Sequence, residues 1–90
     1  MSTVHLLIKG KVQGVFYRAT AKEVAQKLGL KGWVRNTADS HVEAIVTGEE
    51  KAVQHFTDWA NEGPKNARVT EVLVTKIDVI DFSSFEIRRG

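Results

Sequence analysis

Two amphipathic helical patterns among strand-like segments most constrain the folds open to this chain of 90 residues. The first pattern covers residues 19–28, and Gly29 followed by Leu30 predicts that this helix ends in a left-handed Schellman cap. The second follows Gly48-Glu49-Glu50 and stops at Gly63-Pro64. The apolar positions are Ala21, Val24, Ala25 and Leu28 in the first pattern and Ala52, Val53, Phe56, Trp59 and Ala60 in the second. Both helices carry one apolar stripe, which must be buried against another element.

Five further segments have the composition of strands: residues 4–8, 31–36, 41–47, 69–77 and 84–88. In the third of them, Val42, Ala44 and Val46 alternate with Glu43 and Ile45, which is typical of a half-buried strand. The order is βαββαβ with one short strand added, and no linker divides residues 1–90. We therefore expect one α+β domain with a ferredoxin-like fold, in which two helices cover one face of a mainly antiparallel sheet.

Composition sets bounds on partners and compartment. The chain has no cysteine, which excludes disulfides and thiolate chemistry and fits a reducing cytoplasm. Its 13 basic and 11 acidic residues give a formal net charge of +2, so we expect no bulk attraction to nucleic acid or membranes. No apolar run approaches the roughly 20 residues of a membrane span. We expect a soluble, cytoplasmic protein in which Arg88-Arg89 is a solvated chain end.

The stretch Gly10-Lys11-Val12-Gln13-Gly14-Val15-Phe16-Tyr17-Arg18 connects the first strand to the first helix. A glycine-bearing turn that leads into a helix aims several backbone N–H groups at one point, where the helix dipole adds positive potential. Arg18 adds a planar, permanently charged group that can bind phosphate or carboxylate with two hydrogen bonds. By themselves these residues fit an anion site and a tight turn beside a surface arginine equally well.

A second motif, Gly32-Trp33-Val34-Arg35-Asn36, ends the strand after this helix. Together, GKVQGVFYR and GWVRN resemble the motifs of the acylphosphatase family, and the resemblance extends to the closing segment Phe85-Glu86-Ile87. It implies the same ferredoxin-like fold and a small enzyme that hydrolyses acyl phosphates, the mixed anhydrides of carboxylic and phosphoric acids. It also implies a monomer that needs no metal or other cofactor, with inorganic phosphate as product and inhibitor.

The resemblance assigns roles to individual residues. The backbone N–H groups of the loop and the Arg18 guanidinium would hold the phosphate, and the Asn36 side-chain oxygen would accept a hydrogen bond from the attacking water. Because asparagine takes up no proton, a phosphate oxygen of the substrate is the expected proton acceptor. The implied catalytic residues are Arg18 and Asn36. The implied phosphate-binding residues are Gln13, Gly14, Val15, Phe16, Tyr17 and Arg18.

Neighbouring side chains are expected to support the site rather than to react. Val15, Phe16, Tyr17 and Trp33 would pack or line the pocket, while Val12 and Gln13 would act mainly through the placement of their backbone. Histidines suggest no metal site or catalytic base, because the three of them lack the spacing of ligands and belong to neither motif. They are His5, His41 and His55.

Three positions depart from the family pattern. Ser40 stands where glycine is common, and at a positive φ it would cost on the order of 1 kcal/mol. Phe16 stands where smaller residues are frequent, and Arg89 where an aromatic residue often closes the chain. We expect neither Phe16 nor Arg89 to touch the chemistry.

Two other functions remain open from the residues alone, as does a purely structural role for Asn36 at the start of a hairpin turn. An RNA-binding domain of the same strand order would stack bases on aromatic residues of its third strand, but residues 41–46 contain no Phe, Tyr or Trp. A metabolite-sensing domain of this fold would bind an anion without turnover. The family resemblance is what favours the enzyme.

Overall fold

The computed structural model describes residues 1–89, and its elements follow the predicted order. They are β1 (Ser2–Lys11), α1 (Tyr17–Lys27), β2 (Lys31–Asn36), β3 (Val42–Gly48), α2 (Glu50–Glu62), β4 (Arg68–Ile77) and β5 (Phe85–Arg88). The predicted boundaries differ mainly at β1, which is longer at both ends because it pairs with β3 on one side and β4 on the other.

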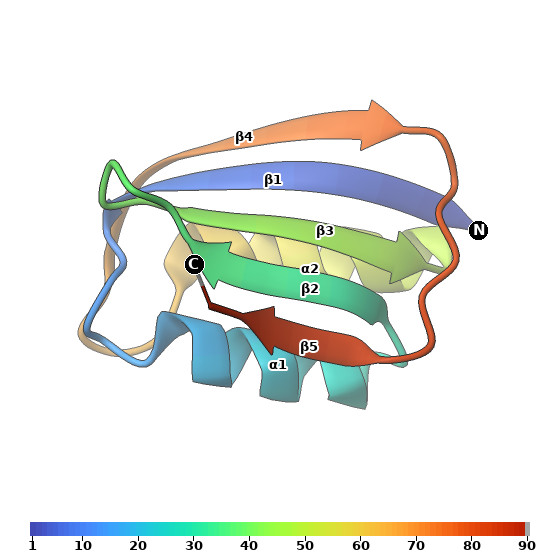
Figure 1. Cartoon of the computed structure of the whole chain (residues 1–90), viewed down its shortest axis with the longest axis horizontal. Helices are drawn as coiled ribbons and strands as arrows, with labels where there is room; N and C mark the ends of the chain where they lie inside the picture. The colour runs from blue at the N-terminus through green and yellow to red at the C-terminus, as the bar shows by residue number, and fades with distance from the viewer. Residues whose placement is uncertain (90) are drawn as a thin grey trace.

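The five strands form one sheet in the order β4-β1-β3-β2-β5, and both helices lie behind the same face of it (Figure 1). All neighbouring strands are antiparallel except β2 and β5, which are parallel. The α+β, ferredoxin-like prediction is therefore confirmed, including the short added strand. The central pairing of β1 with β3, and of β3 with β2, is the connectivity that this fold requires.

The hydrophobic core fills the layer between the sheet and the two helices. Val42, Ala44 and Val46 of β3 are fully buried, as their alternation predicted. On the helix side, Ala21 and Ala25 of α1 lie in the same buried cluster, together with Val53, Phe56 and Ala60 of α2. The predicted apolar stripes thus bury the helices against the sheet, which fixes the position of the first turn of α1.

Helix α1 ends as predicted and begins earlier than predicted. Gly29 has φ of 70°, the Gly29 N–H donates to the Gln26 carbonyl, and the Leu30 N–H donates to the Ala25 carbonyl at 2.8 Å, which is the Schellman arrangement. At the other end the helix starts at Tyr17 rather than at residue 19. The early start places Arg18 in the first turn of the helix.

The topology brings the ends of several elements together at one end of the sheet, across its strands. Strands β1 and β2 are both antiparallel to β3, and β5 is parallel to β2, so the C-terminal ends of these three strands lie together. Helix α1 begins at the same end of the sheet (Figure 1). The two sequence motifs and the end of β5 therefore meet in space.

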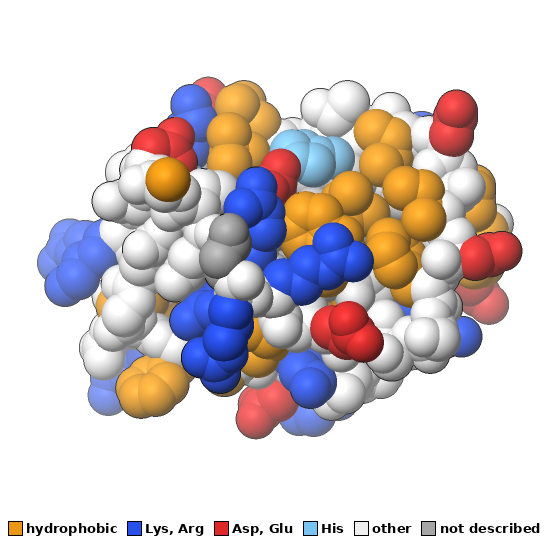
Figure 2. Space-filling view, viewed as in Figure 1, with side chains coloured by type: hydrophobic (Ala, Val, Ile, Leu, Met, Phe, Trp, Pro, Cys, Tyr) orange, Lys and Arg blue, Asp and Glu red, His pale blue; other side chains and the backbone are white. Residues whose placement is uncertain are grey.

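The opposite face of the sheet carries no helix, and Figure 2 shows hydrophobic side chains interspersed with Lys and Arg on it. Leu73 of β4, which pairs with Leu7 of β1, is among its exposed residues. None of the helices in residues 1–89 combines the length and the apolar character needed to cross a membrane.

Candidate active site

The loop between β1 and α1 is held in place by three buried side chains. Val12, Val15 and Tyr17 are buried in the core, whereas Gly14 and Phe16 between them are exposed. Gly14 has φ of 73°, and a Cβ atom there would meet no atom within 4 Å, so glycine is favoured by its backbone conformation rather than by space. The three buried side chains therefore fix the conformation of the loop.

Phe16 immediately precedes α1 and is unusual in its backbone. It has φ of 62° and ψ of 24°, the left-handed region that β-carbon-bearing residues seldom occupy, and its side chain is 79% exposed. No side chain caps the N-terminus of α1, and its first turn contains no acidic residue. The positive end of the helix is thus left open toward the loop.

Tyr17 fixes the start of α1 against α2. Its hydroxyl donates to the Ala60 carbonyl at 2.8 Å, and its ring lies 5.0 Å from that of Trp59, centroid to centroid. Burial raises the pKa of the Tyr17 hydroxyl well above its ordinary value, so this group stays protonated. Tyr17 therefore positions its neighbour Arg18 and does not take part in proton transfer.

Several backbone N–H groups of the loop have no partner among the residues that the structure describes. Within residues 1–89, no hydrogen bond is donated by the backbone of Gly14, Val15 or Phe16. The first N–H groups of a helix also lack partners within that helix. The loop and the start of α1 thus present unpaired donors, as an anion site requires.

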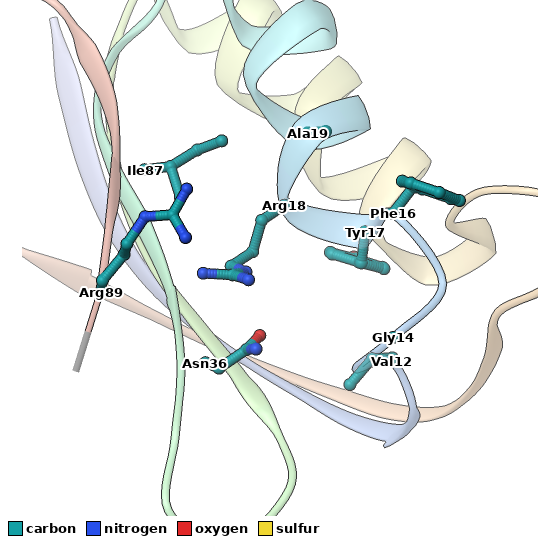
Figure 3. A pocket seen from close by; sticks show the side chains of 9 residues that line it. All are labelled: Val12, Gly14, Phe16, Tyr17, Arg18, Ala19, Asn36, Ile87 and Arg89. Carbon is teal, nitrogen blue, oxygen red and sulfur yellow. The ribbon is translucent and has the colours of Figure 1, made fainter.

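A pocket of about 330 Å³ opens at this point (Figure 3). Of the residues expected at the site, it is lined by Gly14, Phe16, Tyr17, Arg18 and Asn36. Gln13 and Val15 do not line it: Val15 is buried, and Gln13 turns toward a hairpin. Sequence reasoning had left out four further residues of the lining, which are Val12, Ala19, Ile87 and Arg89.

Arg18 and Asn36 approach this pocket from different elements. Arg18 projects from the first turn of α1, and Asn36 is the last residue of β2, on the face of the sheet that carries the helices (Figure 3). The Asn36 Oδ1 atom is buried and has no hydrogen-bond partner within residues 1–89. A buried acceptor without a protein partner is rare in folded proteins, which makes Asn36 a candidate functional residue.

Gln13 corrects one expectation, because its side chain and not only its backbone has a role. Its Nε2 atom donates to the carbonyl of Thr37 at 2.9 Å and to the carbonyl of His41 at 2.8 Å. Both carbonyls belong to the turn between β2 and β3, directly beyond Asn36. The side-chain amide of Gln13 therefore connects the loop between β1 and α1 to the hairpin that carries Asn36. These partners are 24 and 28 residues away, so local sequence patterns could not indicate them.

The turn between β2 and β3 is itself strongly hydrogen-bonded. The hydroxyl of Thr37 donates to Asp39, and this bond is the main reason that the pKa of the Asp39 carboxyl lies below its usual range. The backbone N–H of Thr37 donates to the His41 carbonyl at 2.9 Å. Ser40 has φ of 73°, so the strained conformation considered for it is present.

Arg89 lines the pocket, although neither sequence motif contains it. Phe85, Ile87 and Arg89 are at alternate positions, so they share the face of β5 that is directed toward the helices, and Arg89 lines the pocket beside Arg18. The sequence did not indicate this place for Arg89, and the expectation that Arg89 does not touch the chemistry stays a prediction. Arg88 points to the other face, where its guanidinium lies 4.8 Å from the Trp33 ring centroid. Alternation with Phe85 and Ile87 could indicate the face on which Arg89 lies, but not the pocket that this face reaches.

The three histidines do not line this pocket, and His5 contacts an acidic residue elsewhere on the sheet. The Nε2 atom of His5 lies 2.6 Å from Glu43, and Arg35 donates to the same carboxylate at 2.7 Å. Residues 1–89 contain no group of three or more His, Cys, Asp or Glu side chains that could together hold a metal ion.

Comparisons with known proteins bear on this site. The sequence profile of the family described as Acylphosphatase matches residues 4–87. An acylphosphatase of Acidovorax sp. strain JS42 is 50% identical over 86 residues, which cover 96% of this chain and 89% of the relative. The structure of an acylphosphatase from Coxiella burnetii matches with a TM-score of 0.94 and 39% identity, covering 97% of this chain and 92% of that chain. For acylphosphatase from Bacillus subtilis, the TM-score is 0.93, the identity 32% and the coverage 98% and 99%.

Fold and pocket together define a ferredoxin-like α+β protein with unpaired N–H groups, an arginine and an asparagine at one end of its sheet. Its sequence and its structure match the same family over nearly the whole chain. The chain belongs to the acylphosphatase family, and the resemblance drawn from its two motifs is confirmed.

Proposed function

We propose that this protein hydrolyses acyl phosphates to a carboxylate and inorganic phosphate in the pocket that contains Arg18 and Asn36. The observation that carries the proposal is that Asn36 lines the same pocket as Arg18 and that its buried Oδ1 atom has no hydrogen-bond partner among residues 1–89. Family membership supports it, because the relatives carry the name of this activity.

Substrate binding is assigned to the loop and the start of α1. The unpaired N–H groups of Gly14, Val15 and Phe16 and the positive end of the helix favour a phosphoryl group. The Arg18 guanidinium adds a bidentate contact and neutralises charge on the phosphoryl oxygens in the transition state. In the proposal, Val15 contributes its backbone alone because its side chain is buried.

Water activation is assigned to Asn36. Its Oδ1 accepts a hydrogen bond from a water molecule and orients the water oxygen toward phosphorus. A new P–O bond forms to this oxygen, and the bond from phosphorus to the acyl oxygen breaks with its electron pair leaving on the carboxylate. The proton of the water passes to a phosphoryl oxygen. Since a carboxylic acid has a pKa of about 4 to 5, its carboxylate leaves without a general acid.

The test compares leaving groups. The protein should hydrolyse acetyl phosphate, also in excess chelator, and should turn over an alkyl phosphate monoester far more slowly, because an alkoxide is a much stronger base than a carboxylate. Comparable turnover of the monoester would reveal an acid that this mechanism lacks, and loss of activity in chelator would reveal an ion. Binding of phosphate without any turnover would instead identify a sensor domain.

Arg18→Ala tests the binding half of the proposal. One guanidinium serves both the bound phosphate and the transition state, so hydrolysis and inhibition by inorganic phosphate should be lost together. Arg18→Lys should recover little, because a point charge cannot reproduce the two parallel hydrogen bonds. An Arg18→Ala variant that is still inhibited by phosphate would separate the two roles and contradict the assignment.

A further inference from the structure

Arg89 brings a second guanidinium to the pocket. It directly follows β5, and Figure 3 shows its side chain folded back from the strand end toward Arg18. Its placement follows from the alternation of β5, in which Phe85 is buried and Ile87 half-buried on the same face. The parallel pairing of β5 with β2 brings this strand end beside Asn36. The end of β5 therefore places Arg89 at the pocket, with its side chain exposed to solvent.

Among residues 1–89, neither guanidinium group has a carboxylate partner. No Asp or Glu lines the pocket, and none of the five ion pairs found within residues 1–89 involves Arg18 or Arg89. Two guanidinium groups at one pocket attract anions to it. In the proposed function the phosphoryl group is already matched by Arg18 and the unpaired N–H groups of the loop. The charge of Arg89 is then available for a second anionic group.

We propose that Arg89 binds an anionic group on the acyl part of the substrate, so that the enzyme prefers acyl phosphates whose acyl chain ends in a carboxylate. This inference rests on the proposed function and names the substrate class of the same pocket. Ile87, two residues before Arg89 and on the same face, provides an apolar contact for the carbon atoms of such a chain. The guanidinium and the terminal carboxylate then form the charge-assisted pair for which arginine is suited.

Two substrates and one neighbouring residue test the proposal. Acetyl phosphate has a neutral acyl group, and succinyl phosphate has a carboxylate at the far end of a longer one. Arg89→Ala should lower kcat/KM for succinyl phosphate about tenfold, the effect of losing one hydrogen-bonded ion pair worth about 1.4 kcal/mol. The value of kcat/KM for acetyl phosphate should fall much less, because its acyl group carries no charge. Arg89→Lys should keep part of the preference, because the charge remains.

Arg88→Ala is the matched control, because it removes the same charge one residue away on the opposite face of the sheet. It should leave the ratio between the two substrates unchanged. If Arg89→Ala lowers kcat/KM equally for both substrates, Arg89 is a phosphate ligand and the proposal is wrong. It is equally wrong if neither value changes, or if Arg88→Ala shifts the ratio as much.

The same assay separates this inference from the one on which it rests. Wild-type hydrolysis of acetyl phosphate supports the proposed function whatever the ratio between the substrates, so an unchanged ratio in Arg89→Ala refutes the role of Arg89 alone. A wild-type protein that hydrolyses neither substrate refutes both.

Discussion

Replacing Asn36 with alanine should separate catalysis from stability. Within the described part of the chain, the buried Asn36 Oδ1 atom has no hydrogen-bond partner, and an unsatisfied buried polar group costs about 1–3 kcal/mol. Alanine removes that cost and loses only the packing of a small polar side chain. We expect the free energy of unfolding to stay equal to that of the wild type or to rise by about 1 kcal/mol. For a domain of this size, 1 kcal/mol corresponds to a Tm increase of roughly 4–8 °C.

Turnover should move in the opposite direction. If Asn36 orients the attacking water, kcat with acetyl phosphate should fall about 100-fold or more, equivalent to about 2.7 kcal/mol of transition-state stabilisation. Inhibition by inorganic phosphate should be nearly unchanged, because the amide contacts the nucleophile and not the anion. Steady-state kinetics and thermal unfolding of one preparation measure all three quantities.

Asn61→Ala provides the control for this experiment. Asn61 is exposed on α2, where its Nδ2 donates to the Thr57 carbonyl, and its loss should leave kcat unchanged. Two results would refute the reasoning about Asn36. Destabilisation of Asn36→Ala by more than about 1 kcal/mol would show that the amide supports the fold. Phosphate inhibition weakened tenfold or more, about 1.4 kcal/mol, would make Asn36 a ligand of the substrate.

Three further changes should have separable effects. Gln13→Ala removes both hydrogen bonds from the loop to the β2–β3 hairpin, so unfolding should become easier by about 1–2 kcal/mol and kcat should fall with little change in phosphate inhibition; unchanged kcat would show that the loop holds its shape without them. Ser40→Gly should raise the free energy of unfolding by about 0.5–1 kcal/mol at constant kcat, since φ there is 73°, and a lower Tm would contradict this. Burial disfavours the charge of Glu43, but hydrogen bonds from His5 and Arg35 outweigh it and hold the pKa of the carboxyl below its usual range. With a lowered folded-state pKa, Glu43 stabilises the protein above an unfolded-state pKa of about 4.3 and loses that contribution as pH falls through the folded-state value. The Tm of Glu43→Gln should therefore decline less than that of the wild type between pH 5 and pH 3, and parallel declines would exclude Glu43 as the source.

Local spacing in the sequence determined which residues form elements and which side of each element is apolar. The stripe of Ala21 and Ala25 and the alternation of Val42, Ala44 and Val46 are properties of neighbouring residues, so they predicted the helices, the strands and the ferredoxin-like class. The C-terminal cap at Gly29 could also be predicted from neighbouring residues alone. The start of α1 was not, because Tyr17 joins the helix through contacts with Ala60 and Trp59 of α2.

The tertiary structure decided which residues come together where β1, β2 and β5 end. The two motifs indicated Arg18 and Asn36, but the pairing of β1 and β2 with β3 is what brings their ends together. The link from Gln13 to the hairpin and the presence of Arg89 in the pocket both depend on partners distant in the chain. Periodicity specifies the face on which a side chain lies, whereas the element opposite that face is selected by the packing of the whole core. The two motifs and their family resemblance therefore indicated Arg18 and Asn36, whereas the place of Arg89 in the pocket required the fold.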